Sequence, residues 1–203
     1  VRSVSAIDEK SGWIYFGGTE RSALSRDIYR VKLDGSSFGR LTSRAGSHRV
    51  SFNPGSTLYL DSWSDVATPP QVDLSRSDGT QVRILEPNSV PALSEFPMSN
   101  PEFVSVKTRD SVQLDALMIK PPDFDPSKRY PVYQFAYGGP HNQTVVNSWG
   151  YTEYLYNQLV AAHGAIVWIC DNRTASGKGM VSVAPVYRNF GELELRDIED
   201  CAA

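Results

Sequence analysis

The first hundred residues contain the same pattern of strands and tight turns twice, at an interval of about 44 residues. In the first copy, residues 27–33 alternate apolar and polar side chains and run into the turn Asp34-Gly35. In the second copy, residues 71–76 do the same and run into Asp78-Gly79. A four-stranded propeller blade repeats at about this interval, so the pattern predicts consecutive blades of an all-β propeller. The alternative is a small antiparallel β domain whose halves are similar by chance.

Two blades by themselves leave blade faces uncovered, because each blade of a propeller packs on its neighbours. We therefore expect further blades before Val1, or a poorly stabilised first half. For the isolated chain we expect marginal stability or self-association.

The pattern changes near residues 97–101, where strands and helices begin to alternate. This alternation is typical of an α/β unit with a parallel sheet. One predicted helix places Tyr151 on its apolar face, and the strands on either side of it have the apolar character of buried strands. The expected elements are strands at 112–119, 130–137 and 165–170 and helices at 151–163 and 192–203. We therefore expect the last blades of a propeller in residues 1–100 and the first part of an α/β domain in residues 101–203.

The composition argues against several classes of protein. The formal net charge is -3 and the basic residues are scattered, which disfavours a nucleic-acid or membrane-surface partner. The longest apolar run, residues 165–170, is far shorter than the roughly 20 residues of a membrane-spanning helix. No His, Asp or Glu pairs recur at metal-ligand spacing, so neither a metal nor another cofactor is expected.

The two cysteines, Cys170 and Cys201, lie at the end of an apolar run and in a helix-like tail. Their spacing suggests neither a metal site nor a disulfide framework. We expect both to be buried free thiols.

Two kinds of catalytic candidate have simpler interpretations. Residues 35–39 read Gly-Ser-Ser-Phe-Gly and match the G-x-S-x-G pattern, which acts as a nucleophile elbow only between a buried strand and a helix. Here strands are expected on both sides, so a hairpin turn is predicted. His48, His141 and His163 have no candidate nucleophile nearby, and surface or loop positions are favoured for all three.

Tyr137-Gly138-Gly139-Pro140 ends the strand predicted at 130–137. Open α/β sheets place their chemistry at the carboxyl ends of their strands. A tyrosine hydroxyl there could stabilise the negative charge of a tetrahedral intermediate. An ordinary glycine-rich turn with a packed tyrosine explains the motif equally well.

Asp171-Asn172-Arg173 follows the next predicted strand at the same edge of the sheet. It is interpreted as a scaffold or a carboxylate contact near a substrate, and the alternative is a solvated loop. Asn142-Gln143-Thr144 and Asn172-Arg173-Thr174 also match the glycosylation sequon, a triplet that arises often by chance.

The order and spacing of these pieces resemble the prolyl oligopeptidase family, and within it the dipeptidyl peptidase IV-like serine peptidases. The resemblance covers almost the whole chain. In the first half it depends on segments 25–29, 50–55, 59–65 and 69–70, and in the second half on segments 120–124, 130–132, 137–140, 171–173 and 190–194.

The resemblance implies blades of a β-propeller followed by the first part of an α/β-hydrolase domain. It implies a peptidase that removes dipeptides from N-termini, with proline or alanine second, so peptides are the expected partners. Tyr137 matches the family's oxyanion-hole tyrosine, and Gly138, Pro140, Trp149 and Arg173 would lie in loops near the substrate.

The resemblance also places essential residues outside this chain. The nucleophilic serine and the aspartate and histidine that follow it would lie beyond Ala203, and the paired glutamates that hold the substrate's amine would lie upstream. The isolated chain is therefore expected to be inactive. The family usually has glycine after Asp-x-Arg, whereas this chain has Thr174, so the shape of that loop is expected to differ.

Two other functions fit the same residues. One is an oligopeptidase or acylaminoacyl peptidase of the same family, and the other is a catalytically dead homologue that acts as a binding protein. The resemblance favours an exported protein, and a homodimeric parent is a further expectation.

Overall fold

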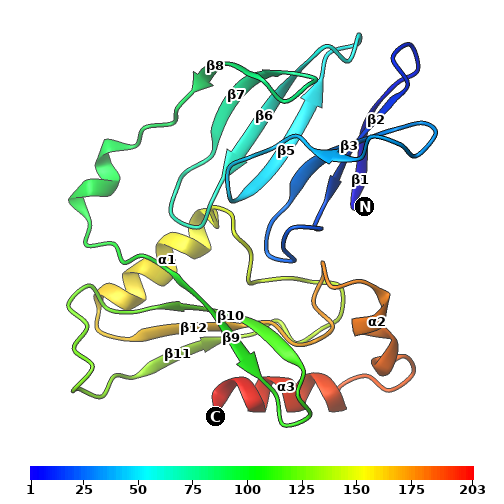
Figure 1. Cartoon of the computed structure of the whole chain (residues 1–203). Helices are drawn as coiled ribbons and strands as arrows, with labels where there is room; N and C mark the ends of the chain where they lie inside the picture. The colour runs from blue at the N-terminus through cyan, green and yellow to red at the C-terminus, as the bar shows by residue number, and fades with distance from the viewer. The chain divides into compact units, whose positions relative to one another are not determined.

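The computed structural model describes the backbone of residues 1–203 and all side chains except those of Tyr151 and Thr152. The predicted place of the Tyr151 side chain on an apolar helix face therefore lies outside the described residues. The chain forms two compact units, which are described separately (Figure 1). The first contains Val1–Val90 and Asn147–Trp149, and the second contains Pro91–Val146 and Gly150–Ala203. No described helix has the length and apolar character needed to cross a membrane.

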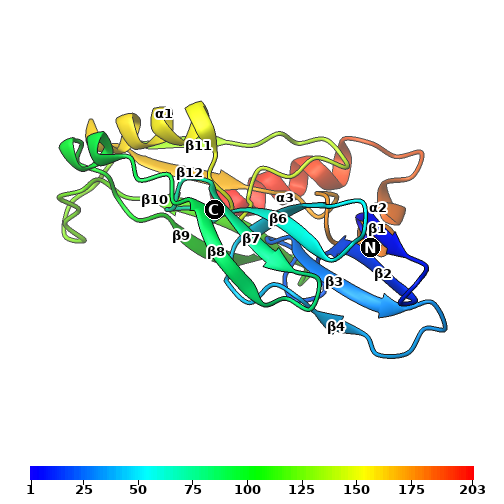
Figure 2. The ribbon, with the colours of Figure 1, turned by 90° about the horizontal axis from the view of Figure 1, so that it is seen from above.

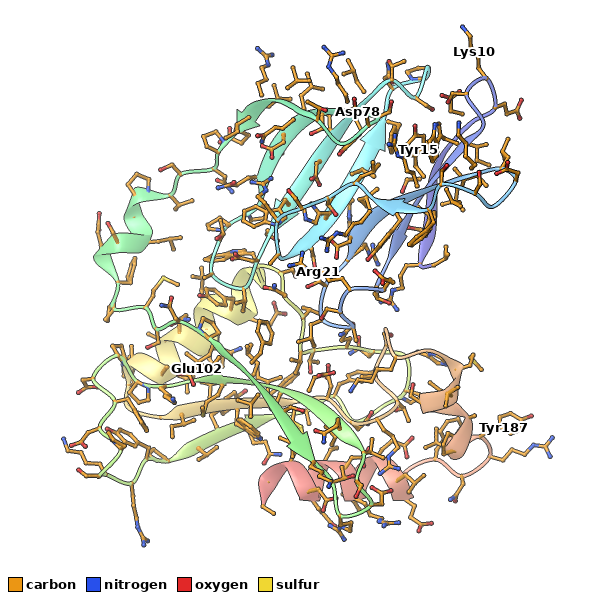
Figure 3. All side chains as sticks on the ribbon, in the orientation of Figure 1. Lys10, Tyr15, Arg21, Asp78, Glu102 and Tyr187 are labelled. Carbon is orange, nitrogen blue, oxygen red and sulfur yellow. A yellow bond between two sulfur atoms is a disulfide. The ribbon has the colours of Figure 1, made fainter. Side chains whose placement is uncertain are left out.

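The first unit contains two four-stranded antiparallel sheets, each with its strands in consecutive order (Figures 1 and 2). The turns expected from the sequence join β3 to β4 and β7 to β8, and Asp78 in the second turn is labelled in Figure 3. The predicted propeller blades are confirmed. The strands are β1 (Ser3–Asp8), β2 (Trp13–Gly18), β3 (Asp27–Lys32), β4 (Gly39–Arg40), β5 (Ser47–Phe52), β6 (Leu58–Ser64), β7 (Gln71–Arg76) and β8 (Gln81–Glu86).

Aromatic side chains fill the space between these two sheets. Tyr15 of β2 is buried, and its ring lies 4.5 Å from that of Phe52 of β5, centroid to centroid (Figure 3). Phe52 in turn lies 5.0 Å from Tyr59 of β6. Such aromatic contacts add to the burial of apolar area, so they join the two blades into one core.

The second unit contains a mixed sheet of strand order β11-β12-β10-β9. Only β11 and β12 are parallel, because α1 carries the chain between them, whereas a short turn joins β9 to β10 and reverses its direction. The predicted parallel sheet is therefore correct for one strand pair, and β9 was missed. The elements are η1 (Pro91–Glu95), β9 (Glu102–Lys107), β10 (Gln113–Ile119), β11 (Val132–Phe135), α1 (Tyr151–Ala162), β12 (Ile166–Cys170), α2 (Met180–Val183), η2 (Ala184–Val186) and α3 (Glu192–Ala202).

β11 is not the buried strand that its composition predicted. Val132 is 59% exposed and Phe135 is 44% exposed. The reason is its place at the edge of the sheet, where β12 is its single described neighbour. Edge strands are covered less than central ones whatever their apolar content.

The cysteines are not free thiols, and that prediction was wrong. Cys170 at the end of β12 and Cys201 near the end of α3 form a disulfide, with their Cα atoms 6.3 Å apart. Both are buried beside Leu114 and Ala116 of β10. The pairing depends on how α3 packs against the sheet, which a spacing of 31 residues does not reveal.

Candidate active site

Tyr137 lies in the turn that follows β11, at the carboxyl end of that strand. Gly138 has a φ of +79°, a left-handed conformation that favours glycine. The Tyr137 ring folds back over the next glycine, because a Cβ atom placed on Gly139 would lie 2.8 Å from Tyr137 Cε1. The Tyr137 side chain is 59% exposed, and no described residue forms a hydrogen bond with its hydroxyl. The hydroxyl can therefore bind an acceptor from outside this unit.

The loop after β12 holds the loop after β11 in place. The Asp171 carboxylate accepts hydrogen bonds from the backbone N–H groups of Thr144, at 3.0 Å, and Val145, at 2.8 Å. Asn172 Nδ2 donates to the Gly138 carbonyl at 2.9 Å. Both residues are about 95% buried, which excludes the solvated-loop interpretation of this segment. The loops after β11 and β12, which the sequence predicted at one edge of the sheet, are thus joined by hydrogen bonds.

Arg173 points into the unit, where it pairs with two carboxylates. Its Nε lies 2.9 Å from Asp197 Oδ2, and its Nη1 lies 2.9 Å from Asp110 Oδ2. Hydrogen bonding from Arg173 holds the pKa of Asp110 below its usual value, and hydrogen bonding to Asp197 raises the pKa of Arg173. With its side chain only 10% exposed, Arg173 supports the loop and is not open to a substrate. The pairing with Asp197 was not found from the sequence, because 24 residues separate the partners.

The other candidate loop residues occupy different surroundings. Trp149 is described with the first unit, where its backbone N–H donates to Ser64 Oγ at 3.2 Å. Pro140 lines an apolar cavity of about 400 Å³ in the second unit. Such a cavity suits an apolar group. Its lining is completed by His141, Met180, Val183, Ala184, Val186, Phe190 and Tyr187, the last of which is labelled in Figure 3.

The remaining catalytic candidates have structural explanations. Residues 35–38 lie in the hairpin turn between β3 and β4, Gly39 begins β4, and no helix follows, as predicted. His141 and His163 are exposed, in agreement with the expected surface positions. The described residues contain no group of three or more His, Cys, Asp or Glu arranged to hold a metal ion.

His48 contradicts its prediction, because it is buried on β5 and not placed in a surface loop. Its Nδ1 lies 2.8 Å from Asp61 Oδ2, and its Nε2 lies 3.2 Å from the Arg44 carbonyl. Both ring nitrogens thus have protein partners. The hydrogen bond to a carboxylate from the neighbouring strand offsets the cost of burying the imidazole.

The sequence and the fold of the chain are similar to those of known proteins. Residues 1–70 match the family model described as the dipeptidyl peptidase IV (DPP IV) N-terminal region. The chain is 32% identical over 207 residues to a probable dipeptidyl-aminopeptidase B of Botryotinia fuckeliana, and 34% identical over 203 residues to that of Penicillium rubens. Each match covers 97% of this chain and 22% of the relative. The chain thus spans about a fifth of the length of these curated relatives.

The fold is similar to that of a solved relative. The crystal structure of Porphyromonas gingivalis dipeptidyl peptidase 4 matches 100% of this chain and 28% of its own chain, with a TM-score of 0.91 and 28% sequence identity. The match includes both the propeller blades and the α/β part. By sequence and by fold, the chain belongs to the dipeptidyl peptidase IV-like family, as its motifs predicted.

Proposed function

We propose that this chain is part of a serine peptidase that releases X-Pro or X-Ala dipeptides from the N-termini of peptides, and that Tyr137 supplies an oxyanion-hole donor. The observation that carries the proposal is the Tyr137 turn, which presents an unpaired hydroxyl at the carboxyl end of β11. The names of the relatives, dipeptidyl-aminopeptidase B and dipeptidyl peptidase 4, support a dipeptide-releasing activity.

The proposed chemistry is acyl transfer through a Ser-His-Asp triad. When the serine attacks the peptide carbonyl, the carbonyl oxygen becomes negatively charged, and the Tyr137 hydroxyl donates a hydrogen bond to it. A rigid donor of this kind contributes about 10²- to 10³-fold to kcat. The family resemblance puts the triad outside this chain, so we propose that the chain alone is inactive.

A serine-reactive fluorophosphonate probe tests the proposal on this chain and on the longer protein that contains it. We expect the longer protein to be labelled and this chain to remain unlabelled. Labelling of this chain would mean that one of its own serines, such as Ser37, is nucleophilic. An unlabelled longer protein would favour a catalytically dead homologue that acts as a binding protein.

The role of Tyr137 is tested by kinetics of the longer protein on an X-Pro dipeptide substrate. Tyr137→Phe is expected to lower kcat by about 10²- to 10³-fold with a small change in KM, because the lost hydrogen bond forms mainly in the transition state. Tyr156→Phe is the matched control, since Tyr156 is similarly exposed, at 53%, on α1. Unchanged kcat in Tyr137→Phe would refute the oxyanion role.

A further inference from the structure

The geometry points to two positioning residues for the Tyr137 turn, Asn172 and Gly139, which set the direction in which the Tyr137 hydroxyl is presented. Their effect on catalysis rests on the proposed function. Their effect on the conformation of the turn does not, and it can be measured without activity.

Asn172 fixes one peptide plane of the turn. Its Oδ1 accepts hydrogen bonds from Thr174 N at 3.0 Å and from Thr174 Oγ1 at 2.8 Å. Because both donors approach this oxygen, the amide nitrogen must face the other way, where it donates to the Gly138 carbonyl at 2.9 Å. Asn172 is 4% exposed and Thr174 is fully buried, so water does not compete strongly for these bonds.

The bond to the Gly138 carbonyl sets the path of the turn directly after Tyr137. A trans peptide is planar, so a carbonyl held in one direction also fixes the N–H group of the next residue. The two loops are joined further by His141 N, which donates to the Thr174 carbonyl at 3.1 Å, and by Ser176 N, which donates to the Asn142 carbonyl at 3.1 Å. Asn172 thus adds a hydrogen bond from the loop after β12 to the glycine turn itself.

Gly139 leaves the space that the Tyr137 ring occupies. A Cβ atom on Gly139 would lie 2.8 Å from Tyr137 Cε1 and 3.4 Å from Cδ1, closer than carbon atoms normally approach. Gly139 does not have a left-handed φ, unlike Gly138 at +79°. Alanine at position 139 is therefore compatible with the backbone, and the clash falls on the Tyr137 ring, which must rotate away.

Nuclear magnetic resonance of this chain tests the conformational part. In the unmodified chain we expect nuclear Overhauser contacts between the Tyr137 ring protons and the Gly139 α-protons. Gly139→Ala and Asn172→Ala are each expected to shift the Tyr137 ring resonances and to weaken the contact to residue 139. Asn189→Ala, at an exposed asparagine of the same unit, and Gly39→Ala, where a Cβ meets nothing within 4 Å, are the matched controls.

Kinetics of the longer protein test the catalytic part. Both variants are expected to lower kcat by about 10- to 100-fold, with KM nearly unchanged, because the donor is misplaced and the substrate is still bound. In a Tyr137→Phe background the same substitutions are expected to have little further effect, since the group that they position is gone. If the two residues had a merely structural role, the substitutions would lower kcat by the same factor with Tyr137 present and with Phe in its place.

The outcomes separate the two proposals. Ring resonances and contacts unchanged in both variants would overturn the positioning role. Altered resonances in the two variants, together with unchanged kcat in them and in Tyr137→Phe, would retain the conformational role and refute the proposed oxyanion role of Tyr137. If Asn172→Ala fails to fold, Gly139→Ala still decides the question, because the added methyl group meets the Tyr137 ring and removes no hydrogen bond.

Discussion

Replacement of Asp197 by alanine tests the ion-pair network under the candidate site. Asp197 is fully buried on α3, and its carboxylate accepts hydrogen bonds from the Arg173 backbone N–H at 2.8 Å, from Nε at 2.9 Å and from Nη2 at 2.6 Å. In Asp197→Ala the guanidinium stays nine-tenths buried and keeps only Asp110 as a described charged partner.

The expected loss follows from that burial. Removing one partner of a buried ion pair costs about 3–5 kcal/mol. Asp110 still pairs with the guanidinium, but its side chain is 36% exposed and does not replace the three hydrogen bonds of Asp197. The second unit has about 110 residues, for which each kcal/mol corresponds to a few degrees in Tm. A loss of 3–5 kcal/mol therefore predicts a decrease of roughly 10–20 °C in the Tm of this unit.

Urea unfolding followed by circular dichroism measures the loss, and hydrogen exchange of α3 shows where it occurs. Glu199→Gln on the same helix is the matched control, because Glu199 is 54% exposed and pairs with an exposed Arg109, so a much smaller change is expected. Equal, small losses in the two variants would refute the reasoning that Asp197 compensates a buried charge.

Three further predictions concern stability. His48→Ala should destabilise the first unit by about 3–5 kcal/mol in urea unfolding, because it leaves the buried Asp61 carboxylate without its partner. His163→Ala, at an exposed position, should change the free energy of unfolding little. Equal effects of the two substitutions would contradict this prediction. Burial raises the pKa of Tyr59 to about 12, so the neutral hydroxyl favours the folded state below pH 10, and this contribution of about 3 kcal/mol is lost between pH 10 and pH 12. Tyr59→Phe should remove that part of the loss of stability at alkaline pH. Ionisation of Tyr59 near pH 10 in the folded protein, followed by absorbance at 295 nm, would refute the raised pKa. Reduction of Cys170–Cys201 by a dithiol should cost about 3.7 kcal/mol for a sequence separation of 31 residues, and unchanged urea unfolding after confirmed reduction would contradict the stabilising role.

The sequence predictions that the structure supports were based on local patterns. The turns Asp34-Gly35 and Asp78-Gly79 and the alternating strands before them are properties of short segments, and they predicted two similar four-stranded sheets. The strand positions in the second unit were predicted in the same way, except for β9. The assignment of residues 1–100 and 101–203 to two domains of a longer protein stays a prediction.

The candidate site was predicted only in part. Tyr137 and Asp171-Asn172-Arg173 were recognised because they follow successive strands, whose carboxyl ends meet at one edge of a parallel pair. The sequence could not say whether Arg173 faces a substrate or the protein interior. The answer depends on Asp197 and Asp110, which pair with Arg173 only once α3 and the turn between β9 and β10 have packed against the loop.

The sequence by itself determined the order of the blades, the strand-helix-strand unit and the turn that bears Tyr137, because periodicity and turn chemistry act over a few residues. The tertiary structure alone decided which distant residues meet: Cys170 with Cys201, His48 with Asp61, and Asn172 with the Gly138 carbonyl. It also decided that the apolar strand β11 lies at an exposed edge. These outcomes depend on how whole elements pack, and packing is a property of surfaces assembled from segments far apart in the chain.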